Sequence, residues 1–173
     1  MKPRPLESYQ AAKKYLFGAL SKESLCTPQI RQRLKRREVS EEIREQLIEE
    51  MIRLGFVDDR AWVEAFVRRQ QGRRDGPSMI KMKLRAKGID SELINEFVSR
   101  DDEMLTHQIV GLLKTRYRKY DLSDFKERQK AIAALARKGF DLEAIRSALE
   151  CCSSAAAFHR RGSASPDDPL QEA

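Results

Sequence analysis

The sequence predicts an all-α protein of three successive units, each with three helices, and with an elongated, curved shape. Apolar residues recur at helical spacing along most of the chain, as they do between Ile43 and Met51. No stretch shows the alternating, β-branched pattern of a strand. One turn pattern also occurs three times, at spacings of 50 and 51 residues, which indicates a repeat architecture.

The repeated pattern joins a leucine at a helix end, a basic cluster, a turn, one apolar residue and a helix N-cap. Its three copies are LKRREVS at 34–40, LRAKGID at 84–90 and LARKGFD at 135–141. The later copies place Gly88 and Gly139 at the turn, where a residue in the left-handed conformation belongs. The first copy has Glu38 there, so we expect its turn to differ locally.

Start and stop signals divide the chain into about nine helices. In the first unit, residues 1–55, Thr27 is the expected N-cap of a helix that has Pro28 at its first position. Ser40 is the expected cap of the next helix, whose first turn is acidic, as the helix dipole favours. Gly55 ends that helix and closes the unit.

The second unit is predicted over residues 56–101 and the third over residues 102–152. Asp58 and Asp59 open the first helix of the second unit, and Asp90 caps its last. Ser123 and Asp141 are the expected caps in the third unit. Residues 153–173, rich in serine, alanine and proline, predict a disordered tail.

Positive charge is concentrated in two segments of a chain whose net charge is +7. Residues 60–87 hold nine basic and two acidic residues, and residues 114–138 hold nine basic and three acidic ones. The two segments indicate a surface that meets an anionic partner, either nucleic acid or acidic protein. A solvated face that only maintains solubility is the alternative.

Helical geometry separates cations from apolar residues within the second segment. At about 100° per residue, Lys126, Lys130 and Arg137 lie within about 40° of one another. The expected packing residues lie opposite, and they are Phe125, Ile132, Leu135 and Ala136. Across both segments the candidate binding residues are Arg68, Arg69, Arg73, Arg74, Lys81, Arg85, Lys114, Arg118, Lys126, Lys130 and Arg137.

Two tyrosines lie among the cations of the second segment. Tyr117 and Tyr120 alternate with Arg116, Arg118 and Lys119, a pattern that suits stacking on nucleic-acid bases. Tyrosines at such positions are more often half-buried packing residues, and we expect packing here.

The residues needed for most chemistry are missing from the sequence. It has no glycine-rich phosphate loop, no Cys-x-x-Cys and only two histidines, His107 and His159. The sequence therefore predicts a protein that is not an enzyme and that has no cofactor and no metal. Cys26, Cys151 and Cys152 form no disulfide framework, which favours the reducing cytoplasm. We also expect no membrane helix, no secretory signal and a monomer.

Several motifs together resemble the RecX family of bacterial regulators of the RecA recombinase. They are LGFVDDRAWVEAFV at 54–67, GPSMI at 76–80, LRAKGI at 84–89 and ALARKGF at 134–140. The resemblance covers about residues 7–150. Glu38 replaces the turn glycine, and Trp62 stands where the family commonly has tyrosine or phenylalanine.

This resemblance implies helix-turn-helix-like repeats in a curved rod that binds in the groove of the RecA–single-stranded-DNA filament. It also implies that the protein limits filament growth, ATPase activity and strand exchange. The expected further partner is single-stranded DNA, with duplex DNA as an open alternative. Two other functions remain open on the residues alone. One is a stand-alone helix-turn-helix nucleic-acid-binding protein, and the other is a helical adaptor without nucleic-acid binding.

Overall fold

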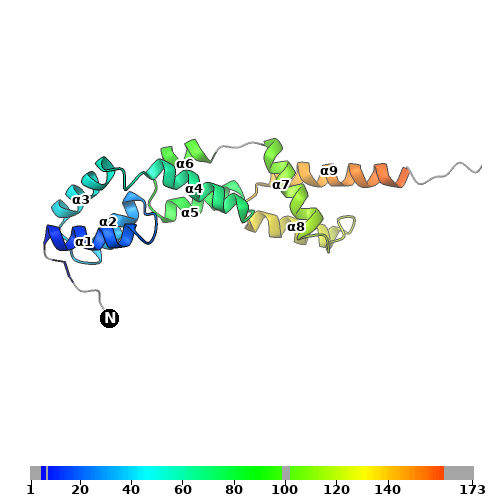
Figure 1. Cartoon of the computed structure of the whole chain (residues 1–173). Helices are drawn as coiled ribbons and strands as arrows, with labels where there is room; N and C mark the ends of the chain where they lie inside the picture. The colour runs from blue at the N-terminus through cyan, green and yellow to red at the C-terminus, as the bar shows by residue number, and fades with distance from the viewer. Residues whose placement is uncertain (1–4, 7, 99–101, 162–173) are drawn as a thin grey trace, which may run out of the picture. The chain divides into compact units, whose positions relative to one another are not determined.

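The structure is a computed structural model, and it describes residues 5–6, 8–98 and 102–161. Every regular element in those ranges is a helix, so the all-α prediction is confirmed (Figure 1). The helices are α1 (Tyr9–Leu20), α2 (Thr27–Lys35), α3 (Glu41–Arg53), α4 (Asp59–Gly72), α5 (Pro77–Ala86), α6 (Ser91–Phe97), α7 (Asp102–Thr115), α8 (Phe125–Arg137) and α9 (Leu142–Arg161).

The chain forms two compact units. Unit 1 lies within residues 1–73 and 80–99, and unit 2 lies within residues 74–79 and 100–173. In unit 1, α1 and α2 pack on α3, and α4 packs on α6. In unit 2, α7 and α8 both pack on α9.

Three separate hydrophobic cores match the three copies of the repeated pattern. Leu34, Leu84 and Leu135 occupy equivalent positions, and each is fully buried in its own core. Within unit 1 the first two cores exchange one residue each. Cys26 belongs to the second core and Val57 to the first, so these two repeats interlock.

The three repeated turns have the same backbone path. Gly88 and Gly139 are left-handed, with φ of 81° and 87°, and Glu38 is left-handed too, with φ of 57°. The Val39 N–H donates to the Leu34 carbonyl oxygen at 3.2 Å, as the equivalent residues of the other copies do. The expectation of a different first turn is therefore wrong, because this bond and the buried Val39 side chain hold the glutamate in the glycine's conformation.

Four of the expected N-caps are confirmed. Ser40, Asp58, Asp90 and Asp141 each accept a hydrogen bond from a backbone N–H two or three residues later. These side-chain acceptors satisfy donors that the first helical turn leaves without an intrahelical partner.

Two other caps are displaced by one residue. Cys26 is the N-cap of α2 and Thr27 is its first helical residue; the Thr27 N–H donates to Asp59 Oδ1 at 2.7 Å. Asp124, not Ser123, caps α8, and it accepts from the Glu127 N–H at 2.8 Å. The Ser123 hydroxyl is directed away from the helix, because it donates to Asp121 at 2.6 Å.

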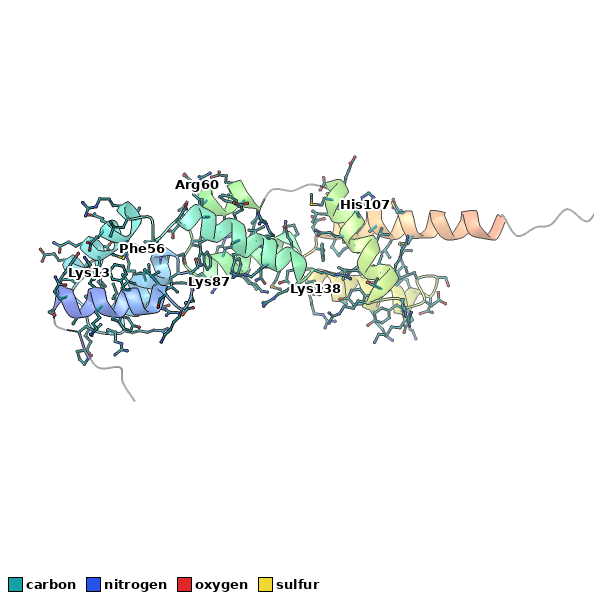
Figure 2. All side chains as sticks on the ribbon, in the orientation of Figure 1. Lys13, Phe56, Arg60, Lys87, His107 and Lys138 are labelled. Atoms are coloured by element: carbon teal, nitrogen blue, oxygen red, sulfur yellow. The ribbon has the colours of Figure 1, made fainter. Side chains whose placement is uncertain are left out.

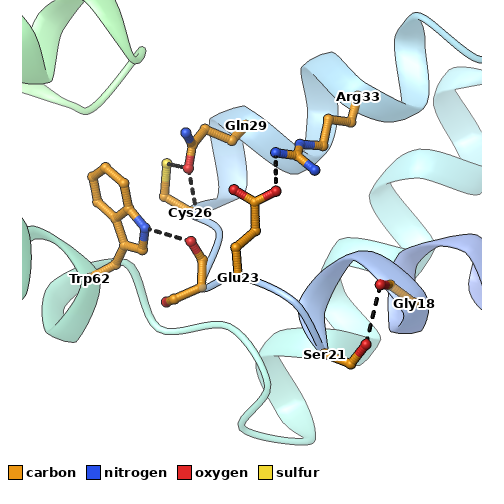
Figure 3. Close-up of polar contacts among 8 residues, drawn as sticks. Gly18, Ser21, Glu23, Cys26, Gln29, Arg33 and Trp62 are labelled. Atoms are coloured by element: carbon orange, nitrogen blue, oxygen red, sulfur yellow. Dashed lines mark hydrogen bonds and ion pairs between the residues drawn. The ribbon is translucent and has the colours of Figure 1, made fainter.

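The connection between α1 and α2 is tied to α4 within unit 1 (Figure 3). The Trp62 indole N–H donates to the Ser24 carbonyl oxygen at 3.0 Å, and Arg33 pairs with Glu23 at 2.6 Å. The Cys26 N–H donates to Gln29 Oε1 at 3.2 Å. This network orders the loop that delivers Cys26 to the second core.

Helix α9 continues past the expected end of the third repeat. It runs through Arg161, so residues 153–161 are helical where a disordered tail is predicted. The sequence from Leu142 to Arg161 contains no glycine or proline and includes three successive alanines, which favour a helix. Residues 162–173 of the expected tail lie outside the described residues.

Two glycines bring backbone segments of unit 2 into direct contact. The Gly76 N–H donates to the Lys138 carbonyl oxygen at 2.7 Å, and the Ser78 N–H donates to the Gly139 carbonyl oxygen at 3.1 Å. A Cβ on Gly76 would lie 2.5 Å from that Gly139 oxygen, and a Cβ on Gly139 would lie 2.3 Å from the Met79 nitrogen. Neither position has room for a side chain.

Candidate functional site

The candidate cations of unit 1 lie on α4, on α5 and just after α4. Arg68 pairs with Glu64 at 2.8 Å, and the Arg69 guanidinium lies 5.9 Å from the centre of the Phe66 ring. The Lys81 ammonium donates to Asn95 at 3.0 Å. Arg73 and Arg85 are exposed. Unit 1 therefore presents a set of cations that local contacts partly orient.

In unit 2, helix α8 separates cations from core as predicted. Lys126, Lys130 and Arg137 are exposed, while Ala131 and Leu135 are fully buried. Lys130 pairs with Glu127 at 2.6 Å, and this hydrogen bond is the main reason that the pKa of Lys130 is raised. Lys126 and Arg137 make no ion pair with the residues that the structure describes. We call Lys126, Lys130 and Arg137 the α8 cation face.

The expected apolar side of α8 is partly wrong. Phe125 and Ala136 are exposed, and the Phe125 side chain is 73% exposed. Ala131 and Leu135 define the buried direction, and Phe125 and Ala136 lie roughly 100–120° away from it around the helix. Only a narrow stripe of α8 reaches the core.

The remaining unit 2 candidates lie outside the α8 cation face. Lys114 is exposed in the last turn of α7. Arg118 lies outside α7, because α7 ends at Thr115 and Arg118 belongs to the following loop. Arg74 donates to the Thr115 hydroxyl at 2.9 Å from a left-handed backbone, with φ of 60°.

Tyr117 and Tyr120 pack against the third core, which confirms the expected packing. Both rings are half-buried. They also stack on each other, with ring centres 6.0 Å apart and planes 25° apart. Burial on one side leaves part of each ring at the surface of the loop between α7 and α8.

The set of predicted site residues omits a lysine that the structure places near two aromatic rings and beside a pocket. Lys87, labelled in Figure 2, lies 5.8 Å from the Trp62 ring centre and 5.7 Å from that of Phe66. It also lines an open pocket of about 330 Å³ together with Arg31 and Lys35. Lys87 is equivalent to Arg37 and Lys138 in the repeated basic cluster, and that repetition was the signal available in the sequence.

Lys138 is a further cation that the predicted set omits (Figure 2). Its ammonium lies 3.5 Å from Asp75 and donates to the Arg74 carbonyl oxygen at 3.3 Å. This contact lies beside the meeting of Gly76 and Gly139. Lys138 therefore supports the backbone contact within unit 2.

Groups suited to catalysis or metal binding are poorly placed. In the described ranges no three His, Cys, Asp or Glu side chains gather as a metal site would require. His107 is exposed on α7, 3.1 Å from the Glu103 carbonyl oxygen. Burial raises the thiol pKa of Cys26 and Cys152, which disfavours the reactive thiolate. No described helix is both long and apolar enough to cross a membrane.

The fold and the surface together define a class: a helical-repeat protein that carries exposed cations on its helices. A family described as the second three-helix domain of RecX matches residues 58–97, and the third three-helix domain of RecX matches residues 103–149. The chain belongs to the RecX family of regulatory proteins.

Individual relatives agree with this membership. A regulatory protein RecX from Chlorobium phaeobacteroides is 33% identical over 68% of this chain and 78% of its own length. One from Neisseria meningitidis is 29% identical over 76% of this chain and 84% of its own length. The crystal structure of RecX from Lactobacillus salivarius has a TM-score of 0.72 at 22% identity, covering 82% of this chain and 94% of that one, and so supports the fold.

Proposed function

We propose that this protein regulates the RecA recombinase by binding the RecA–single-stranded-DNA filament, mainly as an inhibitor. It acts in the cytoplasm as a monomer, and it limits filament growth, ATPase activity and strand exchange without chemistry of its own. Membership of the RecX family supports the regulatory role. The observation that carries the binding mode is the α8 cation face, exposed opposite the buried Leu135.

The physical basis of the proposal is charge complementarity. A recombinase filament on DNA offers phosphates and acidic protein side chains to an incoming cationic surface. Charges in such an interface accelerate association and fix the orientation of the partners more than they raise affinity. A bound repeat protein that contacts neighbouring protomers would then block protomer addition and conformational change.

A charge reversal tests the α8 cation face. We expect Lys126→Glu with Arg137→Glu to weaken the inhibition of RecA ATPase on single-stranded DNA by at least about tenfold in the concentration required. Lys130 is left unchanged because its partner is Glu127. The matched control reverses Lys14 and Lys22, two exposed lysines of unit 1 outside the predicted set.

Both variants change the net charge equally, so a difference between them isolates position from total charge. Equal inhibition by the α8 variant and the control, with circular dichroism unchanged, would contradict the α8 cation face as a binding surface. If the unmodified protein binds bare DNA tightly and leaves the ATPase unaffected, the regulatory role itself fails. The stand-alone nucleic-acid-binding protein then takes its place.

A further inference from the structure

The loop between α7 and α8 in unit 2 concentrates aromatic rings and cations. It spans residues 116–124 and leads directly into Phe125, the first residue of α8 (Figure 1). We call Tyr117, Tyr120 and Phe125, with the surrounding cations, the aromatic platform. The cations are Arg116, Arg118, Lys119 and Lys126.

Phe125 is more exposed than any other large hydrophobic residue described. Its side chain is 73% exposed, compared with 54% for Phe56, whose ring contacts Phe17 edge-on at 5.2 Å. Among the described residues, Phe125 makes no ring–ring or cation–π contact. A single exposed ring does not identify a binding site, so the argument depends on what surrounds it.

The tyrosines supply an ordered aromatic surface next to Phe125 in the chain. Their rings stack, and the Lys119 ammonium lies 5.3 Å from the centre of the Tyr120 ring. Two backbone bonds of 3.0 Å hold this conformation, from the Tyr117 N–H to the Leu112 oxygen and from the Tyr120 N–H to the Tyr117 oxygen. Because the tyrosines also pack on the third core, the loop is anchored to the helices beneath it.

Residues 116–126 hold four cations and two carboxylates, so this segment carries an excess of positive charge, and the carboxylates are engaged in local contacts. Asp121 accepts from Ser123, Asp124 caps α8, and Glu127 pairs with Lys130. By contrast, Arg116, Arg118 and Lys126 are exposed, and none has an ion-pair partner among the described residues. The platform therefore presents rings among exposed cations that outnumber the two exposed carboxylates, Asp121 and Asp124.

We propose that the aromatic platform is a binding site for single-stranded nucleic acid, in which a base stacks on Phe125 and the flanking cations contact phosphates. Exposed aromatic rings combined with cations are how proteins hold single strands without sequence preference, since every base has a stacking face. A duplex hides those faces inside the helix, so the platform should favour single strands. The inference deepens the proposed function and rests on it for the presence of a single strand at this surface.

The test measures binding of the full chain to a fluorescein-labelled oligothymidine by anisotropy, without RecA. We expect Phe125→Ala to weaken binding by about 5- to 150-fold, the range for losing one base–aromatic stack.

The salt dependence of binding separates the ring from the cations. In Phe125→Ala the slope of log affinity against log salt should stay the same, because the ring neutralises no phosphate. We expect Lys126→Gln to reduce that slope by about 0.7. Leu142→Ala, at an apolar side chain 53% exposed in the same unit, is the matched control and should bind normally.

A Phe125→Trp variant reports stacking directly. The natural chain has one tryptophan, Trp62, and its side chain is only 7% exposed in unit 1. We therefore expect oligothymidine to quench the emission of the added indole. Retained affinity in Phe125→Trp together with quenching supports a stacked base, and unquenched emission overturns it.

The outcomes separate this site from the regulatory role. Unchanged oligothymidine binding in Phe125→Ala overturns the platform, even if RecA inhibition persists. Loss of RecA inhibition with intact oligothymidine binding also overturns it, and identifies Phe125 as a contact to protein. Impaired single-strand binding with an unaffected duplex supports the platform, and it does so even if RecA proves not to be the target.

Discussion

At the scale of single residues, Glu38 shows how a repeated turn keeps its geometry without glycine. A side chain in the left-handed conformation is unfavourable by roughly 1–2 kcal/mol, yet Glu38 has φ of 57°. The hydrogen bond from Val39 to Leu34 and the burial of both side chains in the first core offset that strain. A substitution that relieves this backbone strain should therefore increase the stability of the protein.

We therefore expect Glu38→Gly to raise the free energy of unfolding by up to about 1 kcal/mol, after subtracting the greater chain entropy of glycine. Gly88→Ala is the reciprocal change and should lower it by about 1 kcal/mol or more, since its Cβ would also lie 3.0 Å from the Pro28 Cβ. Urea unfolding measures both. A less stable Glu38→Gly protein would show that the glutamate side chain contributes more than its backbone strain removes.

At the scale of helices, capping and ion pairs decide how the elements begin and meet. Helix α1 joins α3 through Glu50, which accepts from the Tyr9 hydroxyl at 2.5 Å and pairs with Lys13 at 2.7 Å. Hydrogen bonds from Lys13 and then from Tyr9 lower the pKa of Glu50, and the bond to Glu50 raises the pKa of Tyr9. The α1–α3 contact is thus sensitive to pH at both extremes.

The pH dependence of the stabilising contribution has opposite signs for Glu50 and Tyr9. The contribution of Glu50 is complete above its ordinary pKa and is lost as the pH falls through the lowered folded pKa. The contribution of Tyr9 is complete below its ordinary pKa and is lost as the pH rises through the raised one. Urea unfolding across pH should therefore show a shallower acid decline for Glu50→Gln and a shallower alkaline decline for Tyr9→Phe. Glu49→Gln, at the exposed neighbour, should leave both the acid and the alkaline decline of the unfolding free energy unchanged. If Glu49→Gln makes either decline shallower, the assignment of that decline to Glu50 or Tyr9 is wrong.

The displaced cap of α8 gives a second test at this scale. We expect Asp124→Ala to lower the free energy of unfolding of unit 2 by about 1 kcal/mol. Ser123→Ala should have an effect of about 0.5 kcal/mol or less, because that hydroxyl contacts Asp121 and not the helix. Thermal unfolding followed by circular dichroism distinguishes the two. The reverse order of effects would restore Ser123 as the cap.

At the scale of the whole chain, the described residues form three small hydrophobic cores and not one large core. Each repeat buries its own leucines, and the residues are further grouped into two units. The one tryptophan, Trp62, is buried in the second core, so its fluorescence reports on unit 1. Circular dichroism reports on helices throughout the chain.

This difference in probes makes the two units separable. We expect Leu135→Ala, in the third core, to destabilise unit 2 by about 2–5 kcal/mol. Circular dichroism should then show an earlier unfolding phase, while the midpoint of the Trp62 transition stays where it is. Met51→Ala in the first core should shift the Trp62 transition instead. A shift of the Trp62 midpoint in Leu135→Ala would mean that the chain unfolds as one cooperative unit.

Periodicity and turn chemistry made most of the fold predictable, and the failures have identifiable causes. The equivalent leucines and caps at spacings of 50 and 51 residues gave the three repeats, because local signals and packing agree there. Phe125 was assigned to the core because an angular stripe does not say how wide the buried sector is. Ser123 and Asp124 compete for one cap, and only the contact of Ser123 with Asp121 resolves the choice.

The candidate site was less predictable than the fold. Charge counts located the basic segments, and helical geometry located the α8 cation face. They could not locate Lys87, whose position over Trp62 and Phe66 depends on how the second repeat packs. Charge counts and helical geometry also could not show which cations are paired with an acidic side chain, as Arg68 is. Such pairing depends on the folded positions of the side chains.

The meeting of Gly76 with Gly139 has a consequence for how the surface of unit 2 behaves in different solvents. The joint consists of main-chain hydrogen bonds at a distance that admits no side chain, so neither ionic strength nor moderate pH acts on it directly. The cations around it are screened as salt increases. Under the proposed function, we therefore expect salt to weaken the electrostatic attraction for a partner while the backbone scaffold that displays those charges stays unaltered, so that salt reverses binding without unfolding.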